Sequence, residues 1–510
     1  MQRFIPDPSS PYTIDECKIR GPADSVFIPD SEDELIQEIA RCNSGRVRVT
    51  VNAMRTGLCG GGVPDGGEVI SLERLDRMIG IGQDDKGYFL RTQPCVSVKR
   101  LTDTLFMKHI DGFSDITPGA CESYRTDKRK FFYPVDPTEM EGSIGGNIAT
   151  NASGPRTFRY GPTRNWVISI RVLLTDGRTM RIDRGKHFAD GKHFDCTVDG
   201  IRLQFDMPSY DFNTDVKNAA GLYSVNGMDL IDVFIGSEGI LGIIIEADIR
   251  LAEWHPLVSN IAFMPDDASA LSLIKDVRHD PVVDPEFLEY FDTGSIDLIR
   301  RVAHTDPSLL MPPDYECSAV FMDMAITDDM QSRYDRLFDL VRKNGGDPSR
   351  SWAGHDADDR ERMFAFRHSV PKSIFEYVAS LKEDMPAINK MGTDMSVPED
   401  RSDEMMSFYR ETLDSFGLEY VIFGHLGNFH PHVEIILKDM EDLERAREAY
   451  SILARKSVEL GGSPSAEHGI GKLKRSYIEM MYGQKGIDDI RRLKQYFDPN
   501  MILNRGDMVE

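Results

Sequence analysis

This 510-residue chain lacks several sequence features that would indicate particular classes of protein. Its seven cysteines are scattered without a Cys-x-x-Cys pair, which excludes a cysteine-ligated iron–sulfur cluster or zinc ribbon. No apolar run reaches the length of a membrane span, and the first residues lack the apolar core of a signal peptide. A formal charge of −24 argues against nucleic acids and acidic membranes as partners. These absences predict a cytoplasmic protein without a transmembrane segment, in which the cysteines stay reduced.

The length is that of roughly two to four folding units rather than one. Short strand patterns and glycine-rich loops fill the first half, whereas longer helical patterns with isolated strands follow residue 255. We therefore expect an α+β protein with a first domain at 1–255, a second at 256–480, and a C-terminal helix and tail at 481–510 that return to the first. A polar segment at 178–223 is expected to be an insertion.

Alternation and helical spacing predict individual elements in both halves. In the first half a helix capped by Ser31 precedes a strand at 47–51, and an apolar strand ends at the turn Asp176-Gly177. Two further strand-like runs are expected within 232–254, on either side of Gly236–Gly239. In the second half we expect helices at 269–278, 326–344, 361–382, 399–416, 440–460 and 483–497, and strands at 258–263, 317–322, 419–423 and 432–437.

Glycine is concentrated in three separate places: residues 52–67, residues 142–161 and Gly236–Gly239. Where a chain has no Cβ atoms, its backbone N–H groups can approach a flat ligand that carries phosphates. None of these segments has the Gly-x-Gly-x-x-Gly pattern that opens a helix, so a Rossmann site is disfavoured. A glycine-rich surface loop beside an ordinary strand is the plainer alternative.

Histidine and glutamate gather near the end of the chain. His430, His432 and Glu434 alternate along one predicted strand and so share a face, with His425 just before them. Glu467 and His468 occupy a glycine-flanked loop. Imidazoles together with a carboxylate suit Zn²⁺, Mn²⁺ or Fe²⁺. The alternative is that these histidines are polar groups satisfied by backbone at the end of a strand.

Five motifs occur in the order found in one family. They are RTGLCGG (55–61), the stretch Ser143–Gly177, GSEGILGII (236–244), FGHLGNFHPH (423–432) and SAEHGIGKLK (465–474). Over residues 25–506 the chain resembles the FAD-linked oxidases of the vanillyl-alcohol-oxidase/PCMH type, in the branch of D-lactate dehydrogenase, D-2-hydroxyglutarate dehydrogenase and the glycolate oxidase flavin subunit. This resemblance implies a two-part PCMH-type FAD-binding domain and an α+β C-terminal cap domain.

The resemblance also implies which residues bind FAD. The loop 55–61 would hold the pyrophosphate, and Arg55, which stands where relatives have glycine, would reach a phosphate. Gly236 and the residues around it would complete the adenine side. The implied FAD-binding residues are Arg55, Thr56, Gly57, Leu58, Cys59, Gly60, Gly61, Pro134, Gly142, Ser143, Gly145, Gly146, Asn147, Ala149, Thr150, Asn151, Ala152, Gly161, Arg164, Glu238, Gly239 and Ile244.

For catalysis, the resemblance implies a divalent metal held by His425, His432 and Glu467. His430 remains an alternative ligand, because a two-residue deletion would pair it with the family's second histidine, and Glu434 is a further candidate. His468 would be the base, and Arg367 would bind the substrate carboxylate. The family lysine two residues before Asp394 is Gly392 here, and Lys390 lies two residues further back.

The implied reaction is oxidation of a D-2-hydroxy acid, such as D-lactate, to the 2-keto acid, with hydride transfer to FAD. An external electron acceptor is then needed: an iron–sulfur subunit, an electron-transfer flavoprotein, a cytochrome or a quinone. Two alternatives remain, a metal-free flavin oxidase of an aromatic or other alcohol and a flavin-carrying electron-transfer subunit. The sequence leaves the oligomeric state open, with a homodimer as one option.

Overall fold

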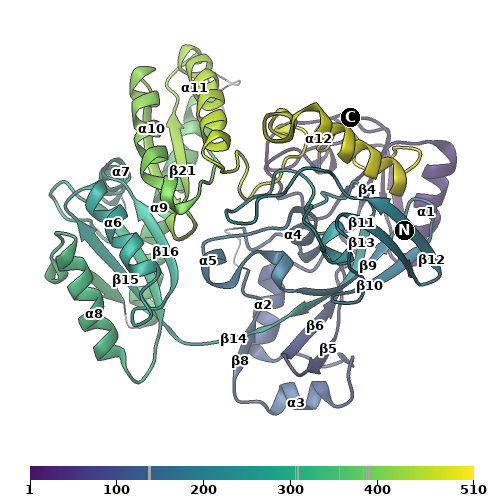
Figure 1. Ribbon diagram of the computed structural model, residues 1–510, viewed down its shortest axis with the longest axis horizontal. Helices are drawn as coiled ribbons and strands as arrows, with labels where there is room; N and C mark the ends of the chain where they lie inside the picture. Colours follow the sequence, from purple (N-terminus) through teal and green to yellow (C-terminus); the bar gives the residue numbers. More distant parts are fainter. Residues whose placement is uncertain are drawn as a thin grey trace.

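The computed structural model describes residues 1–510 except 136–138, 305, 307–308, 355, 383, 386–387 and 389–390. Figure 1 shows the seven-stranded sheet and its helices on one side of the molecule. The other side carries a four-stranded and a six-stranded sheet. Helices and sheets of both kinds are mixed throughout, as the α+β prediction requires.

The four-stranded sheet supports the first glycine-rich loop. Its order is β1 (Gln2–Phe4), β2 (Ser25–Ile28), β4 (Glu68–Ser71) and β3 (Val49–Asn52). Strands β3 and β4 are parallel, and residues 53–67 connect them. Helix α1 (Glu32–Gly45) begins as expected at Ser31, whose hydroxyl accepts the Glu34 N–H. The predicted strand at 47–51 is confirmed as β3.

The six-stranded sheet holds the core of this side. Its order is β10 (Thr179–Asp183), β9 (Val167–Leu173), β13 (Ile243–Arg250), β6 (Gly87–Thr92), β5 (Met78–Asp84) and β7 (Ser114–Asp115). Helices α2 (Val98–Met107) and α4 (Ile144–Thr150) pack beside it. The central strand β13 pairs with both β9 and β6. It therefore joins the part of the chain after the first glycine-rich segment to the part after the second.

The polar segment 178–223, which was expected to be an insertion, contributes the strands β10, β11 (His193–Val198) and β12 (Ile201–Asp206). Its first strand, β10, pairs with β9 and forms an edge of the six-stranded sheet. A hairpin of β11 and β12 follows, and Phe194 and Phe205 bury their rings in the core. Only the loop after β12 leaves the sheets, and it crosses toward the other side of the molecule.

The seven-stranded antiparallel sheet forms the centre of the second half. Its order is β18 (Trp352–Gly354), β15 (Leu257–Met264), β17 (Ser318–Ala325), β16 (Pro285–Phe291), β20 (Glu419–His425), β21 (His430–Ile436) and β19 (Met391–Gly392). Its helices are α6 (Asp267–Arg278), α7 (Thr293–Ala303), α8 (Met330–Lys343), α9 (Ala357–Lys382), α10 (Ser402–Ser415) and α11 (Met440–Glu459). The predicted boundary at residue 255 falls between β14 (Ala252–Trp254), which pairs with β8 (Lys130–Phe132), and β15.

The last part of the chain returns to the first side, where Figure 1 shows α12 (Arg475–Phe497) in yellow. A break at Gly483, whose φ is 66°, divides this helix into two parts. The expected helix at 483–497 corresponds to the second part, and the first part was not predicted. Beyond it, Val49 forms a parallel bridge with Leu503 at the edge of the four-stranded sheet. Ile502 and Leu503 join the core under β3 and β4.

The structure differs from the sequence prediction at two buried places. The apolar run before Gly236 is a 3-10 turn, η3 (Leu230–Val233), because Asp229 caps it by accepting the Ile231 N–H. Strand β16 and helix α7 were not predicted, and every residue of β16 is buried, so it shows no alternation. Among the described residues, no helix has both the length and the apolar character needed to cross a bilayer.

Candidate functional site

A cavity of about 340 Å³ lies where the glycine-rich loops converge. One wall comes from residues 51–62 between β3 and β4, and a second from α4 and the residues around it. The loop at Ser237–Gly239 forms a third. Glu467 and His468, from the loop between α11 and α12, line the same cavity. Segments far apart in the sequence thus share one pocket.

Most residues expected to bind FAD lie in this wall. The lining includes Arg55, Thr56, Gly57, Leu58, Cys59, Gly61, Gly142, Ser143, Gly145, Gly146, Asn147, Ala149, Thr150, Ala152, Glu238, Gly239 and Ile244. The remaining expected residues lie outside it: Gly60, Pro134, Asn151, Gly161, Arg164 and Gly236. Asp15 and Asn504 line the cavity without having been expected, since neither lies near a glycine-rich motif.

Arg164 is a structural residue rather than a cavity residue in this conformation. Its guanidinium donates to the Asp232 carboxylate at 3.0 Å and to two backbone carbonyls, and it stacks over the Tyr223 ring. Arg55 does line the cavity, but its guanidinium lies 3.4 Å from Glu73 and over the Tyr12 ring. Both arginines are therefore held by protein groups, and only Arg55 lines the cavity.

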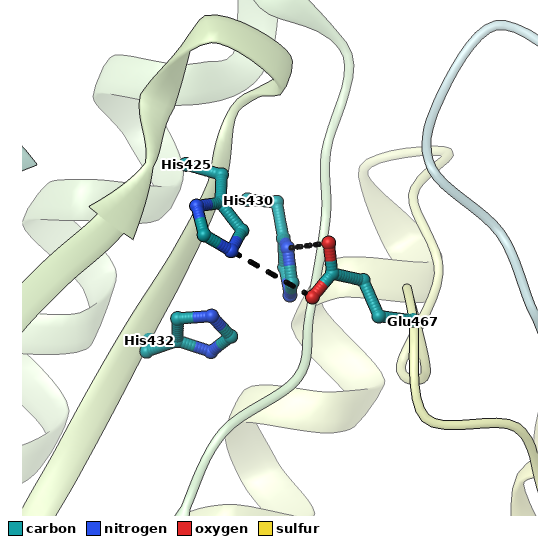
Figure 2. A group of neighbouring side chains, drawn as sticks. All are labelled: His425, His430, His432 and Glu467. Atoms are coloured by element: carbon teal, nitrogen blue, oxygen red, sulfur yellow. Dashed lines mark ion pairs between the residues drawn. The ribbon is translucent and has the colours of Figure 1, made fainter. Parts of the chain in front are cut away.

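Three imidazoles and one carboxylate converge beside this cavity. His425, His430, His432 and Glu467 each offer a ligand atom, and these atoms all lie within 4.8 Å of one another. Figure 2 shows the three rings facing the Glu467 carboxylate. His425 Nε2 lies 3.8 Å from Glu467 Oε2, and His430 Nδ1 lies 3.7 Å from Oε1. His430 and His432, the two alternatives for the second histidine ligand, both lie in this group.

The β20–β21 hairpin explains why the rings meet. The short turn η6 (Leu426–Asn428) places His425 directly across from His430. Gly424 leaves room for the next histidine, since a Cβ there would lie 2.8 Å from the His432 ring. Because residues 430 and 432 alternate on β21, their rings share one face. Glu434 is next on that face but is outside the group of four, packed against Gly392 of β19.

Each imidazole is fixed by an acceptor on the side away from Glu467. His425 Nδ1 lies 2.9 Å from Glu289 Oε1, His430 Nε2 lies 3.1 Å from Asp394 Oδ1, and His432 Nδ1 lies 3.3 Å from the Thr393 carbonyl oxygen. An acceptor there places the ring proton on the outer nitrogen and leaves the lone pair of the inner nitrogen in the cluster. This arrangement of donors fits a divalent metal.

Burial and neighbouring charges separate the histidines. Burial lowers the pKa of His425, and it lowers that of His432 far below the usual value with help from the other two rings. Burial also opposes protonation of His430, but the carboxylates of Glu467 and Asp394 outweigh it and raise its pKa. The pKa of Glu467 is well below its usual range, because Lys217 and two of the histidines outweigh the effect of burial. An ionised Glu467 is the form that binds a cation.

His468 lies at the boundary between cluster and cavity. Its ring stacks parallel to His432 at 6.2 Å between centroids, and its Nδ1 lies 3.2 Å from Asp394 Oδ2. About 30% of its side chain is exposed, in contrast to the buried histidines. Asp394 also accepts the backbone N–H groups of Glu467 and His468. It therefore orders the whole loop, and Lys474, 2.8 Å away, balances its charge.

Arg367, which was expected to bind the substrate carboxylate, does not line the cavity. Its side chain is buried and pairs with Glu289 through two hydrogen bonds, at 2.6 and 3.0 Å. Glu289 in turn contacts His425. Burial alone would raise the pKa of this carboxylate, but Arg367 and His425 outweigh burial and hold the pKa low. The arginine thus supports a histidine of the cluster. Lys390, the candidate substitute for the family lysine, lies outside the described residues.

Three residues of the site were not among the residues predicted to form it. Glu289 belongs to the unpredicted strand β16, and Asp394 follows β19. Lys217 comes from the loop after β12, and its ammonium pairs with Glu467. Glu289 is a charged residue within a fully buried strand, a conflict that could have identified it. The sequence carried no comparable signal for Lys217.

Comparison with known proteins agrees with this architecture. A family model described as FAD binding domain matches residues 23–122 and 123–183, and one described as FAD linked oxidases, C-terminal domain, matches residues 257–508. The glycolate oxidase subunit GlcD of Bacillus subtilis (strain 168) is 26% identical over 95% of this chain and 88% of its own length. A D-lactate dehydrogenase of Anaerostipes hadrus is 24% identical, over 97% of this chain and 92% of its own.

Among solved structures, an alkyldihydroxyacetonephosphate synthase shares the fold, with a TM-score of 0.62 and 15% identity over 96% of this chain and 76% of that one. The two family models together account for both sides of the molecule, and the matched residues include the glycine-rich loop 53–67 and the histidine cluster. The chain therefore belongs to the FAD-linked oxidases.

Proposed function

We propose that this protein is an FAD-dependent dehydrogenase that oxidises a D-2-hydroxy acid to the 2-keto acid with the help of a divalent metal. The observation that carries the proposal is that Glu467 and His468 line the cavity of the glycine-rich loops while Glu467 also belongs to the histidine cluster. A substrate beside the cluster would thus lie against the expected flavin site. The names of the related glycolate oxidase subunit and D-lactate dehydrogenase support a small hydroxy acid as substrate.

In this proposal FAD is held by the loops at 55–61, 142–152 and 238–244, and the metal by His425, His430, His432 and Glu467. When bound, FAD would accept the hydride from C2 of the substrate, and the metal would lower the pKa of its hydroxyl group. His425 and His432 supply neutral nitrogen donors, because burial disfavours their charged forms.

His468 is the proposed base. Since its Nδ1 faces the Asp394 carboxylate, the ring proton resides there and Nε2 is the basic nitrogen. After Nε2 takes the substrate proton, the resulting imidazolium is stabilised by Asp394, whose carboxylate has a pKa well below its usual range. Partial exposure leaves a route by which His468 can return the proton to water. Electrons then leave to an external acceptor.

The test is anaerobic mixing of the FAD-loaded protein with D- and L-2-hydroxy acids while the flavin absorbance is followed. The proposal expects bleaching with at least one D-acid, a loss of about 10²–10⁴-fold in rate for His468→Ala, and loss of bleaching after a chelator removes the metal. Flavin that stays oxidised with every acid tested would exclude the dehydrogenase. Full activity of metal-free protein would exclude the metal. No tyrosine is among the described residues that line the cavity, so the structure offers no support for the aromatic-alcohol oxidase.

A further inference from the structure

Lys217 reaches the histidine cluster from the other side of the molecule. Its loop, after β12, is bonded to the second half of the chain at several points. Ser396 donates its hydroxyl to the Lys217 carbonyl at 2.5 Å, and the Ala219 N–H donates to the Ser465 carbonyl at 2.9 Å. The Ser463 hydroxyl donates to Asn218 Oδ1 at 2.9 Å. The backbone around Lys217 is thus fixed by the strand and loop that carry Asp394 and Glu467.

The lysine side chain is buried with its charge. Only 2% of it is exposed, and its ammonium pairs with Glu467 Oε1 and donates to the Gly154 carbonyl at 3.0 Å. Taking an ammonium out of water costs several kcal/mol, which such partners must offset. The position of the Lys217 ammonium therefore depends on the Glu467 carboxylate, and the position of this carboxylate depends on Lys217.

The charges around the cluster are paired one to one. Glu289 pairs with Arg367, Asp394 with Lys474, and Glu467 with Lys217. The first two carboxylates contact the outer nitrogens of histidines, so their cations lie behind the cluster. Glu467 faces the inner nitrogens. Of these three carboxylates, it is therefore the one proposed to bind the metal. Lys217 is therefore the cation that competes with a metal.

The two oxygens of Glu467 have different surroundings. Oε1 accepts from Lys217 and, at 3.3 Å, from the Ser153 hydroxyl, and it lies 3.7 Å from His430 Nδ1. Oε2 has neither of these two donors and faces His425 Nε2 at 3.8 Å. We propose that Lys217 reserves Oε1, so that Glu467 binds the metal through Oε2 alone, and that its charge weakens metal binding. A one-oxygen ligand leaves more of the coordination sphere for a substrate that binds through two oxygens. This inference rests on the proposed function.

The test compares metal affinity among FAD-loaded full-length variants. Lys217→Met removes the charge and frees Oε1, Lys217→Arg keeps the charge, and Lys186→Met, at an exposed lysine after β10, is the matched control. Competition with a chromophoric chelator should give a Kd about tenfold or more lower for Lys217→Met, and unchanged values for the other two. The metal-induced rise in Tm should also be larger for Lys217→Met, because its metal-free form holds an unpaired carboxylate. KM for the hydroxy acid should rise more than kcat falls.

The outcomes distinguish a failure of this inference from a failure of the proposed function. A wild type that binds metal, with a Kd that Lys217→Met leaves unchanged, overturns this inference and leaves the proposed function standing. Metal binding by neither protein overturns both proposals. Binding by Lys217→Met alone also overturns both, because the wild type then holds no metal for Glu467 to bind through Oε2 or for the proposed reaction. If Lys217→Met folds only with metal present, metal release to excess EDTA replaces the Kd. Release about tenfold slower than from wild type supports the inference, and an equal rate overturns it.

Discussion

Glu238 holds the backbone of the loop that carries Glu467 and His468. Its Oε1 accepts the Ile470 N–H and its Oε2 accepts the Gly471 N–H, both at 2.6 Å. Gly469 makes this approach feasible, because a Cβ there would lie 2.6 Å from Glu238 Oε1. Glu238 was expected on the adenine side of FAD. It lines the cavity, but its carboxylate is directed at this loop, so it joins the two halves of the site.

Replacing Glu238 should therefore misplace the base without emptying the metal site. Glu238→Gln can keep one of the two backbone hydrogen bonds, and Glu238→Ala keeps neither. We expect flavin reduction to slow on the order of tenfold for the first variant and more for the second. Hydrogen exchange at residues 470 and 471 should accelerate in the same order. Unchanged exchange at these amides would show that the carboxylate does not hold the loop.

Arg367 should control metal affinity rather than recognition of the substrate. Arg367→Lys keeps the charge but loses the two-point contact with Glu289, which orients His425. We expect metal affinity to fall about 10- to 100-fold. Substrate KM measured at saturating metal should change little. The opposite result, a raised KM with normal metal affinity, would restore the role in binding the substrate carboxylate that the family resemblance implies.

Each of the three clustered histidines should be needed for metal. His430→Gln and His432→Gln should both reduce metal content, measured by mass spectrometry of the purified protein, because the two rings contribute equivalent donors. His193→Gln serves as the control, since that histidine lies in the β11–β12 hairpin, 42% exposed, beside Asp206. Normal metal content in His430→Gln would return the site to the ligand set preferred from sequence, His425, His432 and Glu467.

Asp292 should make stability depend on pH. Burial, with repulsion from Asp267, raises its pKa to about 6 in the folded protein. Between pH values near 4 and 6 the folded state holds a proton that the unfolded state has lost, so the free energy of unfolding falls as pH rises through this range. Asp292→Asn keeps the cap of α7 and removes the titration.

The Asp292→Asn variant should thus be more stable than wild type at neutral pH, by on the order of 1–3 kcal/mol, with the difference shrinking below pH ~4. Urea unfolding at a series of pH values measures this. A constant difference across the series would mean that Asp292 does not titrate in this range, and lower stability at neutral pH would mean that its contact with Arg410 outweighs its burial.

The elements predicted from sequence were those with a regular period or a local signal. A serine cap and apolar spacing marked α1, and the strands expected at 419–423 and 432–437 correspond to β20 and β21. Strand β16 failed this test because both of its faces are buried, so its apolar residues follow no period of two. One of its two glutamates, Glu289, is stabilised there by its ion pair with Arg367, which lies 78 positions later in the chain.

The sequence predicted the candidate metal ligands but not the charged residues that pair with them or position them. Histidines two apart on a strand reveal a shared face, whereas an ion pair between Lys217 and a residue 250 positions away depends on tertiary structure alone. Arg367 illustrates the same limit: its type suits a carboxylate, but the sequence does not show that the carboxylate belongs to Glu289 rather than to a substrate.

The end of the chain completes the cavity near its beginning. Asn504 accepts the Val51 N–H through Oδ1 and donates to the Glu238 carbonyl, while Lys472 and Asp507 pair beneath Gly60 and Gly61. During synthesis, the glycine-rich loop at 53–67 therefore lacks its support until residues 502–507 have left the ribosome. Cofactor capture should accordingly wait for these residues, and a nascent chain stalled before residue 500 should carry no flavin.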